Sequence, residues 1–255
     1  MEKMRKTILI LLLSLTLFIP LNAQAQFVNG GFEDGDFTGW EQGAGYWYGG
    51  IANLTPPNYL PGGPFYNFSA NASDIVTPGD DPIVGSALNR VYSGNYSARI
   101  NDWVNNYSVS VIKQTVGNWT DPNIFFAWAA VLESSHGPTD SDNFILNLRD
   151  DTQGIDLITR VYNSAVTPQP PFIPSGYWFY TPWQVEQLDV SQYSGDTFTL
   201  SLLASDCPYG GHAGYVYLDG FGAAPPQPTV PEPTTMILLG CGLLGLVGMR
   251  KKFKK

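Results

Sequence analysis

Apolar and polar residues alternate with a period of two in several short segments, and this pattern constrains the fold more than any other feature. In residues 197–205 the apolar positions share one face of an extended chain: Phe198, Leu200, Leu202 and Ala204. Residues 143–149 repeat the pattern with Phe144, Leu146 and Leu148. Five further segments of strand length are bounded by Gly, Pro, Asn or Asp: residues 108–116, 124–132, 155–162, 183–189 and 214–221. No segment between the two ends of the chain sustains a helical apolar stripe. We therefore predict an all-β fold, an antiparallel β-sandwich or jelly roll.

The first 25 residues have the three parts of a secretory signal peptide. A basic start with Lys3, Arg5 and Lys6 precedes an almost wholly apolar run at residues 8–20, and Ala23-Gln24-Ala25 supplies a small-x-small cleavage site. We predict that residues 1–25 form a signal helix, that signal peptidase removes it, and that the mature chain begins at Gln26.

The C-terminal end has its own order of parts. A Pro-rich linker at residues 225–235 leads into an apolar run, residues 236–249, and a basic tail, residues 250–255. Fourteen residues of helix span about 21 Å, less than the ~30 Å hydrocarbon core, although flanking threonines and snorkelling lysines can extend the span. We predict a transmembrane helix with a cytoplasmic basic end. The alternatives are an ordinary membrane anchor and a buried core helix, and the four glycines of the run weigh against the latter.

Pro231, Glu232 and Pro233 precede this apolar run, and the whole tail resembles the PEP-CTERM sorting signal of Gram-negative bacteria that secrete exopolysaccharide. The resemblance implies handling by an exosortase-type transpeptidase near Pro231-Glu232-Pro233 at the inner membrane. The expected destination is the cell surface or the extracellular matrix, after transient anchoring in the inner membrane. The exported body would then be a single domain at residues 26–224.

The exported body is strongly acidic. Five basic and twenty acidic residues in 26–230 give a formal charge of −15, against −9 for the whole chain. Such a surface repels nucleic acid and anionic lipid, so nucleic-acid binding is excluded as a function. It suits solubility outside the cell, neutral sugars or divalent cations.

Three segments of the body carry a second resemblance. Residues 29–35 followed by Gly39-Trp40, residues 91–100 and residues 215–221 resemble the opening, the "SG" turn with its following strand, and the closing strand of galactose-binding-like jelly rolls, which are found in many carbohydrate-binding modules. The resemblance implies a structural calcium ion between the first and last strands. Its ligands would be the carboxylates of Glu33 and Asp219 and the carbonyls of Ser93 and Gly94, a donor set that suits calcium. Asp34 and Asp36 are adjacent alternatives, and simple solvated turn acids are the other interpretation.

Aromatic residues gather in segments rich in Gly, Pro and Asn. Residues 43–85 are predicted to form long surface loops with one or two short strands, and ordered loops often carry the binding function of a sandwich. The candidate sugar-stacking rings are Tyr46, Trp47, Tyr48, Trp103 and Trp178. We expect Trp47 to be exposed because of its place in this loop region. The alternative is that these rings cap the ends of the core.

Cysteine and histidine are scarce. Cys241 lies in the apolar tail, so Cys207 is the single thiol of the processed chain and no intramolecular disulfide is expected. Asp206, Cys207 and His212 could build a metal or thiolate site, or could hydrogen-bond within their own turn. His136 is expected to stand alone and exposed in a Gly-Pro loop.

No motif of catalysis is present: the chain lacks Gly-x-Ser-x-Gly, His-Glu-x-x-His, a phosphate-binding glycine loop and Cys-x-x-Cys. The sequence therefore predicts a non-catalytic, exported β-sandwich that binds exopolysaccharide or another glycan. A structural protein of the biofilm matrix without a specific ligand is the alternative, and an enzyme acting on polysaccharide comes third.

Overall fold

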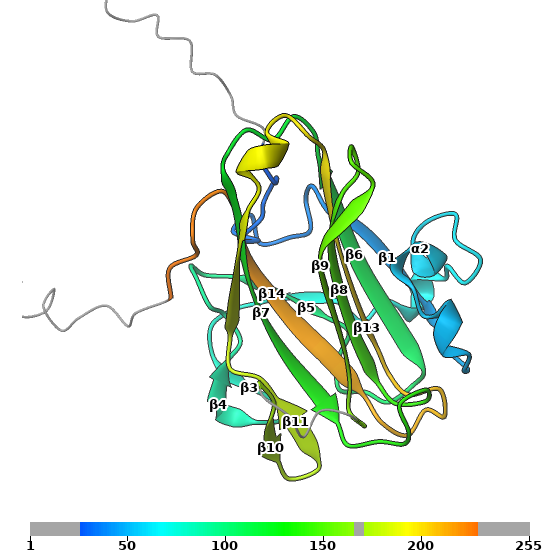
Figure 1. The fold of residues 1–255 in the computed structure, drawn as a ribbon. Coiled ribbons are helices and arrows are strands. Elements are labelled where there is room, and N and C mark those ends of the chain that lie inside the picture. Colours follow the sequence, from blue (N-terminus) through cyan, green and yellow to red (C-terminus); the bar gives the residue numbers. More distant parts are fainter. Residues whose placement is uncertain (1–25, 166–170, 229–255) are drawn as a thin grey trace, which may run out of the picture.

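Two antiparallel sheets pack face to face in the computed structural model, which describes residues 26–165 and 171–228 (Figure 1). The prediction of an all-β antiparallel sandwich is confirmed. The predicted signal peptide (residues 1–25), Pro231-Glu232-Pro233, the apolar run (236–249) and the basic tail (250–255) lie outside the described residues. Within the described part of the chain, no helix combines the length and the apolar character needed to cross a bilayer.

The first sheet, here sheet A, has five strands in the order β1-β6-β13-β8-β9. Their bounds are Glu41–Tyr46 for β1, Ser108–Val116 for β6, Phe198–Ser205 for β13, Asn143–Asp150 for β8 and Ile155–Asn163 for β9. The central strand β13 sets the register, because Leu202 lies opposite Ile112 on one side and Leu146 on the other.

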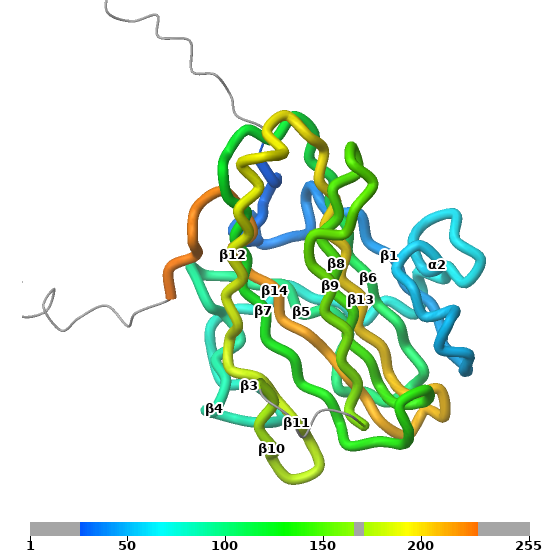
Figure 2. The backbone as a smooth tube through the Cα atoms, viewed as in Figure 1, coloured from blue at the N-terminus to red at the C-terminus, as the bar shows by residue number. Residues whose placement is uncertain are grey.

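The second sheet, here sheet B, has seven strands, six of them in the order β10-β11-β7-β14-β5-β2. Their bounds are Ile173–Ser175 for β10, Trp178–Tyr180 for β11, Asn123–Glu133 for β7, Gly214–Gly222 for β14, Ser97–Ile100 for β5 and Asp74–Val76 for β2. The remaining strand, β12 (Gln184–Asp189), pairs with β7 beyond the end of β11 (Figure 2). A separate hairpin joins β3 (Asp80–Asp81) to β4 (Gly85–Asn89).

The alternation seen in the sequence produces the core between the sheets. The apolar faces of β13 and β8 point inward, as predicted, and meet inward residues of β7, β14 and β5. The members with no exposed surface include Phe198, Leu200, Leu202, Ala204, Phe144, Leu146, Leu148, Phe126, Val216, Leu218 and Ile100. Fully burying each large apolar side chain contributes about 1.5–3 kcal/mol, so this layer is the main source of stability.

The N-terminal segment, residues 27–40, closes one end of the sandwich. Phe27, Phe32 and Trp40 are buried against the core. The backbone N–H of Phe221 donates to the carbonyl of Gly30 at 2.9 Å, and any side chain at position 30 would overlap that backbone. The opening segment is therefore tied to the last strand, β14.

Residues 47–60 cover part of the outer face of sheet A, which corrects the prediction of surface loops for residues 43–85. Four side chains of this segment are buried against β6 and β13: Trp47, Leu54, Tyr59 and Leu60. The segment contains η1 (Ile51–Asn53) and the short helix α2 (Pro56–Tyr59), and η2 (Phe68–Ala70) follows it. The remaining helical turn is η3 (Ser191–Tyr193). The apolar residues of the 47–60 segment do not follow the two-residue period of a strand. The sequence alone therefore did not reveal that this segment packs on sheet A.

Candidate functional site

The outer face of sheet A carries two rows of polar side chains that run across four strands. The first row is Lys113, Ser201, Asn147 and Thr159, and the second is Thr115, Thr199, Arg149 and Asp156. We call these eight residues the polar ladder. They occupy the outward positions of β6, β13, β8 and β9, where the alternation places polar residues. At about 4.8 Å between strands the ladder spans roughly 14 Å.

Hydrogen bonds within the polar ladder hold its side chains in place. The hydroxyl oxygens of Thr115 and Thr199 lie 2.6 Å apart, and Asn147 Nδ2 donates to Thr159 Oγ1 at 3.1 Å. Arg149 Nη1 forms an ion pair with Asp156 at 3.0 Å. Side chains that are already fixed lose little entropy when a ligand binds, so the ladder is preorganised for polar contacts.

An apolar wall borders the polar ladder. The next row across the sheet, Val111, Leu203 and Ile145, packs beneath residues 47–60. The ladder and Ile145 of the wall line an open hollow of about 680 Å³, to which Pro56, Pro57 and Leu60 contribute apolar surface. This volume lies in the range of ligand sites in proteins, ≈300–1,000 Å³. We call this hollow the sheet A groove.

Tyr46 ends β1, and Trp47 and Tyr48 begin the covering segment, where Trp47 points toward sheet A and Tyr48 toward solvent. The ring of Tyr48 is 72% exposed, lies 6.3 Å from that of Tyr46 and 5.0 Å from that of Tyr107. Tyr48 also lines a second hollow of about 390 Å³, together with Tyr209. In contrast, Trp47 is 1% exposed. The expectation that Trp47 is exposed is wrong, because the covering segment folds back onto sheet A and buries this ring between Leu54 and the strands.

Trp103 and Trp178 belong to the other side of the molecule. Both rings contact Tyr215 of β14, at centroid distances of 6.1 and 6.2 Å, on the outer face of sheet B. Trp103 is 40% exposed, and the guanidinium of Arg99 lies 4.7 Å from its ring centroid. The five aromatic candidates therefore form no common binding face.

Glu33 and Asp219, the proposed calcium ligands, converge on the turn at residues 92–96. Asp219 Oδ2 accepts hydrogen bonds from the N–H groups of Tyr92 and Ser93, at 3.0 and 2.8 Å. Glu33 Oε1 accepts from the N–H groups of Asn95 and Tyr96, at 2.9 and 3.1 Å. The two carboxylates thus tie the opening segment and β14 to the same turn. Ser93 meets Asp219 through its N–H, whereas a calcium site requires the carbonyls of Ser93 and Gly94.

One oxygen of this group is left for a cation. Asp219 Oδ1 is buried and has no hydrogen-bond partner, and Glu33 lies close enough to repel it. Burial and this repulsion raise the pKa of Asp219 to about 7, against the hydrogen bonds from the turn. A buried carboxylate oxygen without a partner is costly, so this one oxygen, rather than the full ligand set, is available to a cation.

Asp206 is a hydrogen-bond hub that sequence reasoning did not identify. It accepts from the N–H groups of Asn106 and Ser108 and from Nδ2 of Asn101, rather than within its own turn. Burial raises its pKa to about 7. No local signal marked this role, because its partners lie about a hundred positions earlier in the chain.

The polar ladder was also not proposed as a site, although the polar faces of its strands were visible in the alternation.

One comparison with known proteins agrees with the sorting signal expected at the C-terminal end. Residues 229–252 match the PEP-CTERM protein-sorting motif, so the chain is an exported protein processed at the membrane. No curated protein matches the sequence.

Among solved structures, the fold is similar to several carbohydrate-binding modules. One, in complex with β-1,4-galactotriose, is 13% identical with a TM-score of 0.41, and the match covers 77% of this chain and 95% of that one. Another, specific for non-crystalline cellulose, is 12% identical with a TM-score of 0.39, covering 79% and 95%. The likeness is one of overall fold.

Proposed function

We propose that the exported sandwich binds a neutral glycan in the sheet A groove without catalysing its conversion. The observation that carries this proposal is the polar ladder, a continuous set of hydroxyl, amide and charged groups beside an apolar wall. Sugars present hydroxyl groups at their edges and C–H groups on their faces. A groove with ordered polar groups on its floor and prolines at its side matches both.

The charge of the body favours neutral partners over acidic ones. At −15 for residues 26–230, the protein repels polyanionic polysaccharide unless a divalent cation bridges the two. Binding of a neutral glycan is expected to change little with salt, because no net ion pair is formed.

A glycan array followed by calorimetry on the hit tests the proposal. Asn147→Ala removes a side chain from the centre of the ladder, and the lost hydrogen bonds, each worth about 1 kcal/mol, should weaken binding about tenfold. Val161→Thr is the matched control, because Val161 is an exposed residue on the same sheet in β9 that does not line the groove. Its affinity should equal that of the parent.

Each other outcome supports a different function. Equal binding by Asn147→Ala and the parent contradicts the sheet A groove as the site. Silence across the array favours a structural role in the extracellular matrix, and release of sugar during the assay favours an enzyme.

The sorting motif supports a proposal about processing. We expect an exosortase-type transpeptidase to cleave near Pro231-Glu232-Pro233 and release the body to the cell surface or matrix. In the native host the mature protein should lack the basic tail, and Glu232→Ala should leave the tail attached. Mass spectrometry of the C-terminus is the measurement, and an intact tail on the parent protein contradicts the proposal.

We also propose that a calcium ion stabilises the fold without taking part in glycan binding. Glu33 and Asp219 would hold the ion, with Ser93 and Gly94 reorienting to present carbonyl oxygens. The support is the buried Oδ1 of Asp219. The ion would fasten the opening segment to β14 and would not touch the glycan.

A further inference from the structure

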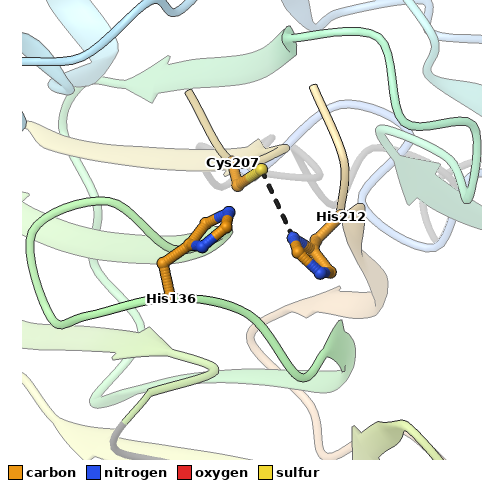
Figure 3. A group of neighbouring side chains, drawn as sticks. All are labelled: His136, Cys207 and His212. Atoms are coloured by element: carbon orange, nitrogen blue, oxygen red, sulfur yellow. Dashed lines mark hydrogen bonds between the residues drawn. The ribbon is translucent and has the colours of Figure 1, made fainter. Parts of the chain in front are cut away.

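Three side chains that are far apart in sequence meet at one end of the sandwich. His136 belongs to the loop between β7 and β8, whereas Cys207 and His212 belong to the turn between β13 and β14. One ligand atom from each, the cysteine sulfur and a ring nitrogen from each histidine, lies within 4.8 Å of the others (Figure 3). His136 is exposed, as expected, but it is not alone, because its ring centroid lies 4.8 Å from that of His212.

The turn itself brings Cys207 and His212 to face each other. The N–H of Cys207 donates to the carbonyl of His212 at 3.0 Å, and the N–H of Gly210 donates back to the carbonyl of Cys207 at 3.2 Å. Gly210 has a φ of +66°, which glycine adopts without strain. In addition, the N–H of Gly211 points at the sulfur of Cys207, at 3.4 Å. Metal ions bind cysteine as the thiolate.

The separation of the Cys207 sulfur and the His212 nitrogen matches that of two ligands of one zinc ion. Bond lengths of about 2.3 Å to sulfur and 2.0–2.1 Å to nitrogen give a sulfur–nitrogen separation of about 3.6 Å in a tetrahedral zinc site. The sulfur of Cys207 lies 3.6 Å from Nδ1 of His212. His136 has only to approach by about an ångström, and it sits on an exposed loop. Ser135 Oγ lies 3.1 Å from the same Nδ1, so the ion would displace this hydroxyl.

The surroundings favour a positive charge. Asp206 begins the turn, and Glu133 and Asp142 lie against it: Glu133 Oε2 accepts from the N–H of Ala213 at 3.0 Å, and Asp142 Oδ2 is buried without a hydrogen-bond partner. Burial raises the pKa of Asp142 well above its usual value, and the charges of Asp206 and Glu133 raise it further. A cation beside this acidic group would relieve the repulsion.

We propose that His136, Cys207 and His212 bind a zinc ion, with solvent as the fourth ligand. Thiolate and imidazole suit zinc, whereas calcium and magnesium prefer oxygen donors. The ion would clamp the 134–142 loop to the 206–213 turn. These two segments supply Thr139, Asp140, Pro208 and Tyr209 to the 390 Å³ hollow beside Tyr48, so the metal would also order that wall.

Metal titration of the full chain in detergent tests the proposal. Every variant carries Cys241→Ser, so that Cys207 is the sole thiol. The reduced, metal-free protein is titrated with Zn²⁺ against a chromophoric chelator, and with Co²⁺ to record its absorption. We expect one ion per chain and a thiolate-to-cobalt charge-transfer band that Cys207→Ser abolishes.

His136→Gln is the decisive variant, because an exposed side chain can be changed without disturbing the fold. It should weaken zinc binding more than about 100-fold, since even the loss of an outer-shell partner costs 10–100-fold. Its melting temperature without metal should equal that of the parent. Thr139→Ala, also exposed in the same loop, is the control and should keep full affinity.

Two results overturn the zinc site. One is a parent protein that binds no zinc or shows no thiolate band with cobalt. The other is zinc affinity in His136→Gln equal to that of the parent.

Discussion

The outer faces of the two sheets differ in how their polar residues are used. On sheet A the polar ladder stays open, and only the neighbouring apolar row is covered by residues 47–60. On sheet B the hairpin of β3 and β4 lies over β14, and Asp81 accepts hydrogen bonds from the hydroxyls of Tyr215 and Tyr217 at 2.8 to 3.0 Å. One face leaves its polar groups exposed beside an open hollow, whereas the other covers its polar groups and bonds them to Asp81.

This difference explains why aromatic content is a poor guide to the binding face. Sheet B has the richer aromatic surface, since Trp178, Trp183, Tyr215 and Tyr217 all belong to one cluster there. That cluster is packed beneath the β3–β4 hairpin and around Asp81, so most of its rings are structural. Sheet A has few rings over its groove, yet it retains the free polar surface that recognition of a sugar needs.

Among the changes that test the two faces, replacing Trp47 should lower the free energy of unfolding most. Trp47→Ala removes a buried ring from the cover of sheet A, and we expect a loss of about 3–5 kcal/mol in the free energy of unfolding, measured in urea. Tyr48→Ala, at the next position but 72% exposed, should change it by less than about 0.5 kcal/mol. Equal effects of the two changes would show that residues 47–60 do not pack on sheet A.

Calcium and pH should change the stability of sheet B, because both act on Asp219 of β14. Its pKa, raised to about 7 by burial, exceeds the value of about 3.9 for an unfolded aspartate. The folded state therefore holds the proton more tightly. Without calcium, the stability from this group is full below pH 4 and is lost as the pH rises through 7. Asp206, whose pKa is also raised to about 7, acts in the same direction.

Calcium should oppose this loss, because it binds the charged form of Asp219. At a hundredfold excess over Kd, the ion should add about 2.7 kcal/mol at pH 8, measured by thermal melting with and without chelator. Asp219→Asn should remove most of this response, and Asp74→Asn, an exposed acid of β2 in the same sheet, should keep it. An identical melt with chelator and with calcium would retire the site.

The smallest expected change in stability tests the outer face of sheet B, which the β3–β4 hairpin covers. Asp81→Asn keeps an acceptor for the two tyrosine hydroxyls but removes its charge, so each hydrogen bond weakens. We expect a loss of about 1–2 kcal/mol in the free energy of unfolding. Asp80→Asn changes the exposed neighbour and should have almost no effect. A full-sized effect at Asp80 would mean that the hairpin, rather than the hydrogen bonds, closes the face.

The structure confirms most of the strands and the core that the sequence predicted. β6 has the predicted bounds, and those of β7, β8, β12, β13 and β14 differ by no more than one residue at either end. Alternation determines which side of a strand is apolar, and that side must face the other sheet, so local pattern and tertiary structure agree. The strands β10 and β11 were not predicted, because three residues are too few to show a period, and β1 and β4 were not predicted either. The strands β2 and β3 lie within residues 43–85, for which one or two short strands were expected without bounds.

What the sequence by itself determined is therefore the sorting motif, the all-β class, the inward faces of the long strands and the acidic charge of the body, whereas the signal peptide stays a prediction. Each depends on composition or on neighbours within about ten residues. Tertiary structure alone decided that Trp47 is buried while Tyr48 is exposed, that the polar faces of four strands align into one ladder, and that His136 reaches Cys207 and His212. These outcomes depend on strand order and register, which bring together residues as far apart as Lys113 and Ser201, or His136 and Cys207. No local pattern encodes such pairings, because they follow from the way the whole chain buries its apolar surface.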